Sequence, residues 1–550
     1  MAATLDRLLI LGLDGATWTV LEPMMRRGLM PHLSTMLKQA ARGTLRSTIP
    51  PVTSAAWTTM MTGCSPSRHG IFDHRYYDAS SDRMKVNNAS RVRVPTVWHQ
   101  VSRRQGPIVC LNLPMTYPPL DVPGVVVSGM DAPHLEAALS GSAAFAEKLR
   151  NEAPEYGLKY FWKRVPRTLE ELTSNAAGTV RSFLGRARGG VVADRFVPDW
   201  ATLMVQFQNL DPFQHRVWRY LNVDATGIEA PEWNEAAWSV LRGLDEAIGI
   251  LLDLASRRGA GVMVVSDHGF GSCLGRIHVN RVLIDAGVAR VPGTWGQVTR
   301  RATQALDRLR LFQAKRGDPE ARSSSFDQSV RAQFPFDWKR TLAFAPHQDT
   351  AAMIYLNSKS RRGSGGSQHE APIQTEGQLD RARGETAAAL ADAQDPETGR
   401  RLFPTIIETA SAYDLDPARE GYPDVIALPD ENYWVRTKLS RGRAWIEPDA
   451  NLPGTHRPEG VIALGGAGLS PSTRLEARLE DAAPTILKLL NLPIPPYMEG
   501  KPLDCLSDLP TARLDPADPG IPAPHRTNVE YTAEEQAIIE QRLADLGYLE

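Results

Sequence analysis

The stretch Val262-Met263-Val264-Val265-Ser266-Asp267-His268-Gly269 is the most informative part of this chain. A run of β-branched apolar residues is typical of a strand buried on both faces of a parallel sheet. Residues at the carboxyl end of such a strand face the crevice where open α/β sheets bind ligands. Asp267 and His268 occupy that end and predict two metal ligands on a rigid support. The simpler interpretation is that these are polar residues at the end of a strand, followed by a glycine turn. A metal site therefore needs support from other parts of the chain.

Other apolar runs alternate with helical segments. We expect buried strands at Leu8–Leu13, Ile108–Asn112, Val125–Ser128, Leu203–Phe207, Val262–Ser266, Val425–Leu428 and Val461–Leu464. Apolar residues recur at helical spacing over Asn234–Ser256, and Asn234 is the predicted N-cap of that helix. The alternation of strand, helix and strand predicts an α/β fold with a mostly parallel central sheet and helices on both faces.

The length of 550 residues allows one large domain with insertions. We expect a catalytic domain over residues 1–505 with a cap insertion at about 290–335, then a proline-rich linker and a C-terminal helix over 506–550. Thr532 and Glu535 predict a capping box for that helix, which would pack on the domain or on a second subunit. Within the insertion, Gln297–Arg316 is basic and amphipathic, which is typical of a solvated cover helix; a membrane or an anionic partner is the alternative.

Composition excludes several classes of protein. The formal net charge of -1 favours neither nucleic acid nor an anionic membrane as a partner. The four cysteines are far apart in the sequence and predict no disulfide framework. The first apolar run is too short to span a membrane and carries no signal-peptide cleavage pattern, so we expect a cytoplasmic protein.

Four further residues extend the candidate metal site. Asp14 ends the first predicted strand, Asp211 and His215 lie four residues apart just after another, and His456 lies in a glycine-flanked turn before Val461–Leu464. Taken singly, each has a simpler explanation as a turn residue, a helix cap or an exposed histidine. With Asp267 and His268 they make three aspartates and three histidines. Such a set suits two divalent ions, and the imidazoles favour zinc over magnesium.

A hydroxyl group completes the candidate site. Pro50-Pro51-Val52-Thr53-Ser54 predicts a loop followed by a helix that continues to Gly63. Thr53 and Ser54 would then stand at a helix N-terminus, where the helix dipole and free N–H groups favour an alkoxide or a phosphate. Either residue could instead be an ordinary N-cap.

Taken together, the motifs resemble the type I phosphodiesterase/nucleotide pyrophosphatase family of the alkaline phosphatase superfamily. The resemblance covers most of residues 8–503. It rests on these motifs in order: Gly12-Leu-Asp14-Gly15, Pro51-Val-Thr53-Ser54, Thr62-Gly63-Cys-Ser-Pro66-Ser-Arg-His69-Gly70, Asn112-Leu-Pro114-Met-Thr-Tyr-Pro118-Pro119, Asn209-Leu-Asp211-Pro-Phe-Gln-His215, Ser266-Asp267-His268-Gly269, Asp337-Trp338, Gly454-Thr-His456 and Ala483-Pro484-Thr485.

The resemblance implies an alkaline-phosphatase-like fold and a hydrolase that acts on a small-molecule phosphate ester. One ion would be held by Asp211, His215 and His456. The other would be held by Asp14, Asp267, His268 and the Thr53 hydroxyl. Zinc is the expected metal and manganese the alternative. Thr53 would be the nucleophile that forms a phosphothreonine, with Ser54 as the fallback. The oligomeric state is left open.

Two features depart from the family pattern or imitate another one. Nucleotide pyrophosphatases of this family carry an asparagine that holds a phosphoryl oxygen where this chain has His74. Cys64-Ser65-Pro66-Ser67-Arg68 matches the sulfatase signature, although here it follows Thr62-Gly63 instead of preceding a Thr-Gly pair. The alternatives to a phosphodiesterase or phosphatase are therefore a sulfatase or phosphonate hydrolase that uses Cys64, or a phosphomutase-type relative.

Overall fold

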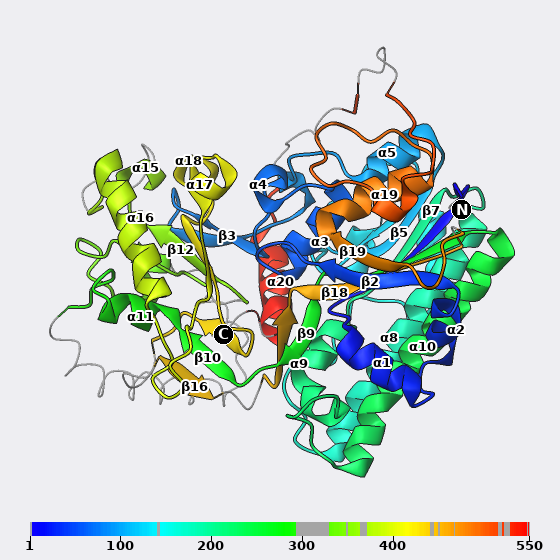
Figure 1. Cartoon of the computed structure of the whole chain (residues 1–550), viewed down its shortest axis with the longest axis horizontal. Helices are drawn as coiled ribbons and strands as arrows, with labels where there is room; N and C mark the ends of the chain where they lie inside the picture. Colours follow the sequence, from blue (N-terminus) through cyan, green and yellow to red (C-terminus); the bar gives the residue numbers. More distant parts are fainter. Residues whose placement is uncertain are drawn as a thin grey trace. The chain divides into compact units, whose positions relative to one another are not determined.

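The computed structural model describes residues 3–139, 143–292, 329–347, 350–362, 371–439, 445–448, 452–466, 468–514, 520–521, 529–546 and 548. The chain is divided into two units, each with its own sheets (Figure 1). The first unit comprises Met1–His74, Asn87–Leu274 and Asp449–Glu550. The second comprises Arg75–Val86 and Gly275–Pro448.

The main sheet of the first unit is mostly parallel, as predicted. Among the described residues its strands follow the order β19 (Arg474–Arg478), β2 (Ala40–Arg46), β18 (Glu459–Gly465), β8 (Gly261–Val265), β1 (Leu8–Leu13), β7 (Thr202–Phe207), β5 (Ile108–Leu113) and β6 (Gly124–Ser128). Strand β18 runs antiparallel to both of its neighbours, and the other pairings are parallel. Sequence analysis missed β2 and β19, because neither carries a continuous apolar run.

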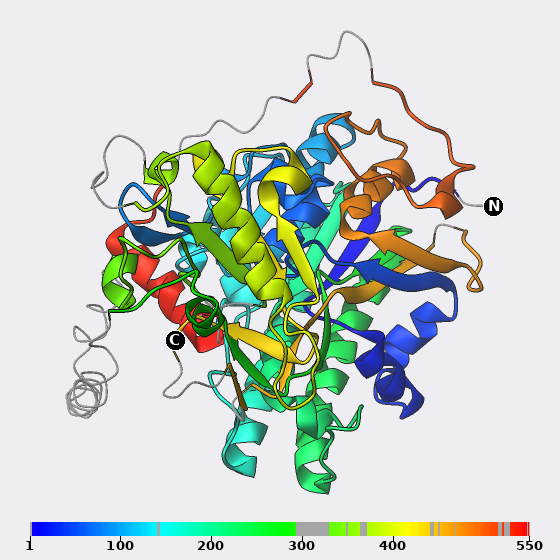
Figure 2. The same cartoon turned by 60° about the vertical axis from the view of Figure 1, so that its left-hand side comes forward.

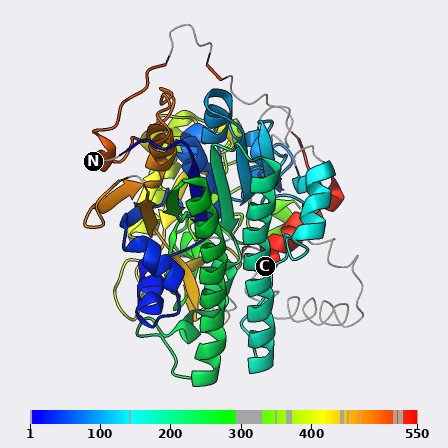
Figure 3. The same cartoon turned by 90° about the vertical axis from the view of Figure 1, so that its right-hand side faces the viewer.

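Helices cover both faces of this sheet, which confirms the predicted α/β architecture. In β1, Leu9 and Leu11 belong to one buried apolar cluster, whereas Leu8 and Ile10 belong to the other. The first cluster includes residues of the long helices α8 (Leu169–Phe196) and α10 (Pro231–Arg258), which lie side by side in Figure 3. The second cluster includes residues of α3 (Thr53–Thr62), α5 (Val97–Arg104) and α19 (Ala482–Leu489). Each buried leucine or isoleucine contributes about 2 kcal/mol to folding.

The predicted N-cap of α10 was wrong. Pro231 occupies the first helical position and Ala230 is the cap, so the cap lies four residues earlier than expected. Proline favours that position because its fixed φ suits a helix start and its missing N–H is not needed there. Asn234 lies inside the first turn, where Oδ1 accepts a hydrogen bond from the Ala230 N–H over 2.8 Å.

The second unit contains a smaller antiparallel sheet in the order β11 (Ala343–Phe344), β12 (Ala352–Leu356), β14 (Val425–Leu428) and β13 (Thr405–Glu408). Helix α16 (Glu376–Ala391) packs on this sheet (Figure 2). The run Val425–Leu428 is a strand as predicted, but it pairs here instead of in the main sheet. An apolar run predicts burial without specifying its partner strand.

The cap insertion expected at about 290–335 falls within the second unit. That unit extends over Gly275–Pro448 and also includes the hairpin of β3 (Arg75–Asp78) and β4 (Arg83–Val86). The basic stretch 297–316 lies outside the described residues.

The C-terminal helix α20 (Ala533–Leu546) belongs to the first unit, so the tail beyond residue 505 is part of the same unit as the main sheet. The capping box is confirmed: Thr532 Oγ1 accepts from the Glu535 N–H over 3.2 Å, and Glu535 Oε2 accepts from the Thr532 N–H over 2.9 Å. Among the described residues, no helix has both the length and the apolar character needed to cross a membrane.

Candidate active site

Four of the predicted ligands follow neighbouring strands of the main sheet. Asp14 follows β1, Asp267 and His268 follow β8, and Asp211 lies in the first turn of α9 (Leu210–Leu221), which begins shortly after β7. Strands β7, β1 and β8 are adjacent and parallel, so their carboxyl ends meet at one edge of the sheet. Asn209 is the N-cap of α9 and makes no side-chain capping bond, so Asp211 is not a helix cap.

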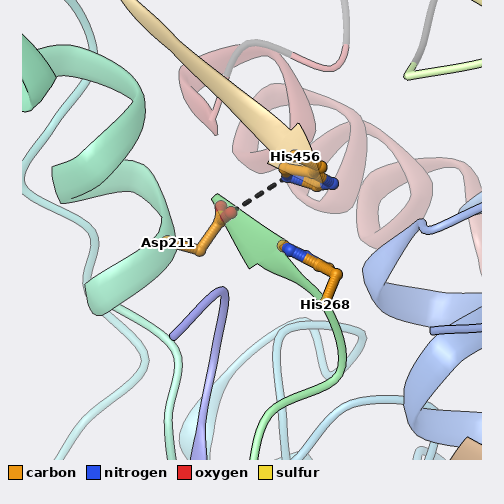
Figure 4. A group of neighbouring side chains, drawn as sticks. All are labelled: Asp211, His268 and His456. Carbon is orange, nitrogen blue, oxygen red and sulfur yellow. Dashed lines mark hydrogen bonds and ion pairs between the residues drawn. The ribbon is translucent and has the colours of Figure 1, made fainter. Parts of the chain in front are cut away.

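The two remaining histidines come from a helix and a strand. His215 lies one turn after Asp211 on α9. His456 lies in β17 (Gly454–Arg457), which pairs with β9 (Gly269–Ser272). The expectation of a turn position for His456 was therefore wrong, since His456 itself belongs to a short strand. Figure 4 shows Asp211, His268 and His456 with their polar ends turned toward one another.

Asp211, His215 and His456 form a close triad. Asp211 Oδ1 lies 3.0 Å from His456 Nε2 and 3.4 Å from His215 Nε2. The two Nε2 atoms are 3.1 Å apart. All three side chains are fully buried. One carboxylate oxygen and two imidazole nitrogens thus converge at a spacing that a single ion could span.

Asp14, Asp267 and His268 form the second group. His268 Nε2 lies 3.3 Å from Asp267 Oδ2 and 3.8 Å from Asp14 Oδ1. Their ligand atoms lie within 4.8 Å of one another, and so do ligand atoms of Asp211, His268 and His456. The rings of His268 and His456 are stacked with centroids 3.6 Å apart. The six predicted ligands therefore make two adjoining groups that meet at His268.

The histidine orientations suit metal binding. Nδ1 of His215 donates to the Gly454 carbonyl over 2.9 Å, Nδ1 of His268 to that of Gly269 over 3.0 Å, and Nδ1 of His456 to that of Pro51 over 2.8 Å. A carbonyl can only accept, so each Nδ1 carries the proton. Nε2 is then left with a lone pair, as in histidines that ligate a metal through Nε2.

Neighbouring donors fix the carboxylates. Asp14 Oδ2 accepts from Trp57 Nε1 over 3.0 Å and from Gln206 Nε2 over 2.6 Å. Asp267 Oδ1 accepts from the Gly15 N–H over 3.1 Å. Sequence analysis did not identify Trp57 or Gln206. The signal was present for Gln206, since it is a polar residue inside the apolar run Leu203–Phe207.

Four of the buried polar atoms without a hydrogen-bond partner among the described residues belong to predicted site residues. They are Asp14 Oδ1, Thr53 Oγ1, Asp267 Oδ2 and His268 Nε2. Leaving a buried polar group unsatisfied costs about 1–3 kcal/mol, and more for a charged group. Orphaned atoms of this kind in a native structure indicate a missing partner such as an ion. These are the atoms that a cation between Thr53 and the second group would engage.

The pKa shifts also indicate missing positive charge. Burial raises the pKa of Asp14 well above its ordinary value, and the Asp267 and Asp211 carboxylates raise it further. Burial likewise raises the pKa of Asp267. Burial would also raise the pKa of Asp211, but His215 and His456 outweigh it and hold that pKa well below the ordinary value. The pKa values of Asp14 and Asp267 are thus raised where that of Asp211 is lowered, and a divalent cation bound beside Asp14 and Asp267 would favour their charged forms.

Thr53 is the first residue of α3, and its side chain is fully buried. The N-cap is Val52 and no side chain caps the helix, so Thr53 is not a capping residue. Both ligand groups are contacted from here: the Pro51 carbonyl, just before the helix, accepts from His456, and Trp57 within the helix donates to Asp14. Thr53 therefore begins a helix whose flanking residues contact both groups.

His74 and Cys64, both singled out from the sequence, lie near opposite ends of α3. Ser54 Oγ lies 2.5 Å from Nδ1 of His74, which stands where the family pattern has asparagine. Cys64 follows the C-terminal end of α3 and is fully buried; its thiol donates to the Tyr497 carbonyl over 3.2 Å. Burial raises the pKa of the Cys64 thiol to about 12.

A further residue at the site gave no signal in the sequence. Tyr548, near the C-terminus, donates a hydrogen bond from Oη to Asp211 Oδ2 over 3.2 Å. Nothing in the spacing of the chain links residue 548 to residue 211, so only the fold could reveal this contact.

The fold and the six clustered candidate ligands are typical of a hydrolase of the alkaline phosphatase superfamily. The chain belongs to the type I phosphodiesterase/nucleotide pyrophosphatase family, whose sequence profile matches residues 8–456. This confirms the family, the fold and the enzyme class that the sequence motifs predicted. Enzymes of this family depend on metal ions.

Two solved structures are similar to this chain at low sequence identity. Phosphonoacetate hydrolase from Sinorhizobium meliloti 1021, in complex with phosphonoformate, is 17% identical with a TM-score of 0.50; the match covers 88% of this chain and 97% of that chain. Murine ectonucleotide pyrophosphatase/phosphodiesterase 5 is 15% identical with a TM-score of 0.46; the match covers 89% of this chain and 96% of that chain. A search of curated proteins returned no match.

Proposed function

We propose that this chain hydrolyses phosphate esters with Thr53 as the nucleophile between two divalent ions. The observation that carries the proposal is the set of buried, unpartnered atoms Asp14 Oδ1, Thr53 Oγ1, Asp267 Oδ2 and His268 Nε2. Three of them are metal-ligand atoms and the fourth is a hydroxyl oxygen. Buried polar atoms with a structural role usually have hydrogen-bond partners within the protein, and here four unpartnered atoms gather at one place.

The ligand types support two ion positions. Asp211, His215 and His456 would hold one ion, and Asp14, Asp267, His268 and the Thr53 hydroxyl would hold the other. Mixed carboxylate and imidazole ligands favour zinc, with manganese as the alternative. When bound, a pair of divalent cations lowers the pKa of a nearby hydroxyl and stabilises the charge that develops on a phosphoryl group.

Thr53 would act in two steps. In the first, its Oγ loses a proton and bonds to phosphorus while the bond from phosphorus to the leaving-group oxygen breaks, and that oxygen departs as an alcohol after taking up a proton. In the second, water attacks phosphorus and the bond to Thr53 Oγ breaks. A monoester would yield inorganic phosphate, and a diester would yield a phosphomonoester. The N-terminus of α3 adds its free N–H groups beside the phosphoryl charge.

Cys64 is not part of the proposed chemistry. It follows the last turn of α3, whereas Thr53 begins the first turn. A helix of ten residues is about 15 Å long, so the two side chains lie at opposite ends of α3. A sulfatase-type nucleophile at residue 64 could not reach an ion that Asp14 and Trp57 flank.

The test is hydrolysis of 4-nitrophenyl phosphate and bis(4-nitrophenyl) phosphate, together with metal analysis of the purified chain. We expect about two divalent ions per chain and a loss of turnover of at least about a thousandfold in Thr53→Ala. Thr62→Ala is the matched control, because that buried threonine ends the same helix and its hydroxyl bonds only backbone, donating to the Thr58 carbonyl and accepting from the Cys64 N–H in the described structure.

Acid quenching during turnover followed by mass spectrometry should locate phosphate on Thr53. Full activity in Thr53→Ala would contradict the proposal, and phosphate on Ser54 would move the nucleophile by one residue. Transfer of the phosphoryl group to a second hydroxyl of the substrate in place of water would identify the phosphomutase-type alternative.

A further inference from the structure

The C-terminal helix is fixed to the first unit close to the candidate active site. Helix α20 is drawn in red in Figures 1 and 2. The Arg542 guanidinium donates to three carbonyls of one loop, those of Met130, Ala132 and Pro133, over 2.5, 2.6 and 3.1 Å. The apolar face of the helix is buried, with Leu543 only 1% exposed. These contacts seat the tail at a defined position on the unit.

The end of this helix is held by the element that carries two predicted ligands. Arg216 Nη2, next to His215 on α9, donates to the Leu546 carbonyl over 3.2 Å. The Tyr548 N–H then donates to the Leu543 carbonyl over 2.9 Å, so the chain turns back just after the helix. Tyr548 is 2% exposed as a result. A tyrosine two residues from the last residue of the sequence is thus buried against the active site.

The Tyr548 side chain lies directly against candidate metal ligands. Its Oη donates to Asp211 Oδ2 over 3.2 Å and lies 3.5 Å from His456 Nε2. Its ring packs on the His74 ring with centroids 4.5 Å apart, and the His215 ring meets it edge-on at 6.1 Å. The ring therefore fills the space between His74 and the triad of Asp211, His215 and His456.

We propose that Tyr548 is a specificity-determining residue, whose ring limits the size of the second ester group on a phosphate substrate. This inference rests on the proposed hydrolysis of phosphate esters. A phosphoryl group close to the triad and to Thr53 has Tyr548 and His74 on one side. A monoester has one carbon substituent to accommodate, whereas a diester has two. The substrates selected would be phosphomonoesters and diesters with a small second group.

The test measures binding, so that it does not depend on turnover. Inorganic phosphate and diphenyl phosphate are titrated into the zinc-loaded full chain in a Thr53→Ala background. We expect Tyr548→Ala to increase the affinity for diphenyl phosphate about tenfold relative to the affinity for inorganic phosphate. This is the scale on which the shape of a pocket discriminates between apolar groups. Tyr548→Phe keeps the ring and should keep the parent ratio.

Two further variants guard against indirect effects. Tyr531 lies on the same tail but away from the candidate ligands, and its hydroxyl donates to the Asp131 carbonyl. Tyr531→Phe removes that hydroxyl and should leave the ratio of the two affinities unchanged. Tyr548→Trp keeps an aromatic anchor and enlarges it, so it should weaken diphenyl phosphate even if Tyr548→Ala does not fold. The melting temperature of each variant reports on folding.

An unchanged ratio in folded Tyr548→Ala overturns the proposal. An equal gain for both ligands also overturns it, because the tail would then obstruct the whole site. Failure of the proposed function would look different. The enzyme with Thr53 intact would then hydrolyse neither 4-nitrophenyl phosphate nor bis(4-nitrophenyl) phosphate, while substitution of Tyr548 would still change the binding of diphenyl phosphate relative to phosphate. Binding of neither probe in any variant would overturn both.

Discussion

Gln206 Nε2 lies 2.6 Å from Asp14 Oδ2, and the backbone register explains how the two side chains meet. Gln206 on β7 stands opposite Gly12 on β1, two residues before Asp14. A Cβ on Gly12 would lie 3.2 Å from Gln206 Cγ and 3.0 Å from the Trp57 ring. Glycine at position 12 thus lets both donors approach Asp14 Oδ2. The protein engages one oxygen of the carboxylate and leaves Oδ1 without a hydrogen-bond partner among the described residues.

Replacing Gln206 by leucine should weaken metal binding while the fold is kept. The variant removes a donor that orients Asp14, and loss of such an outer-shell partner costs about 10–100-fold in metal affinity. Competition with a chromogenic zinc chelator measures the change. Thr202→Val in the same strand is the matched control, because Thr202 is buried and its hydroxyl has no partner among the described residues. Equal zinc affinity in Gln206→Leu and the parent would contradict the orienting role.

Replacing Asp14 by asparagine should stabilise the metal-free protein and abolish metal binding at the second group. Burial, Asp267 and Asp211 raise the pKa of Asp14, so its charged form is disfavoured in the folded chain. A carboxyl group whose pKa rises on folding contributes stability below its unfolded pKa, and that stability is lost as pH rises through the folded pKa. The gain from Asp14→Asn should therefore be largest at neutral pH and should shrink on acidification.

Thermal melts of the chelator-treated variant and parent across pH check this prediction. Asp194→Asn is the contrasting control, because Asp194 is paired with Arg258 at 2.7 Å and its replacement should destabilise the chain. A lower melting temperature for chelated Asp14→Asn at neutral pH would argue that the carboxylate is compensated within the protein.

Much of the fold could be predicted because the local signals agree with the tertiary structure. The run Leu8–Leu13 coincides with β1, and Thr53 does begin a helix. The clustering of the candidate ligands could be predicted because carboxyl ends of adjacent parallel strands converge, which places Asp14 and Asp267 together whatever the loops do. These inferences need only the period of the apolar pattern and the direction of the strands.

The remaining features depend on contacts that the local sequence does not specify. Val425–Leu428 has the pattern of a buried strand, yet its partners are β12 and β13 of the second unit. Tyr548 reaches Asp211 because Arg542 and Arg216 hold the tail by hydrogen bonds to backbone carbonyls. Every residue has a backbone carbonyl, so the acceptors cannot be recognised from the sequence. Side-chain bonds to backbone leave no pairwise signal in a single chain.

Replacing His74 by asparagine should increase hydrolysis of nucleotide diesters relative to aryl monoesters. The family pattern places at this position an amide that holds a phosphoryl oxygen. In this chain Nδ1 of His74 is engaged with Ser54 Oγ at 2.5 Å, and its ring packs on Tyr548. Asparagine would supply the amide donor and leave more room beside the ring of Tyr548.

Rates on 4-nitrophenyl thymidine monophosphate and 4-nitrophenyl phosphate give the ratio, and we expect it to rise about tenfold, as for one added hydrogen bond to a charged group. Ser54→Ala is the control, because it removes the hydroxyl partner of His74 without adding an amide. If Ser54→Ala raises the ratio of diester to monoester hydrolysis as much as His74→Asn does, the increase comes from loss of the contact between Ser54 and His74. The new amide would then not be its cause.

Replacing Cys64 by alanine should leave phosphate-ester hydrolysis unchanged. The thiol is fully buried and donates to the Tyr497 carbonyl. It follows the C-terminal end of α3, whereas Thr53 stands at the N-terminal end. Burial raises its pKa to about 12, so almost no thiolate exists at neutral pH. In the folded chain an alkylating reagent should modify the partly exposed Cys505 before Cys64. Mass spectrometry of the Cys64 peptide should find an intact cysteine. An aldehyde at this position, together with loss of sulfate-ester hydrolysis in a folded Cys64→Ala variant, would instead establish the sulfatase chemistry that the local signature imitates.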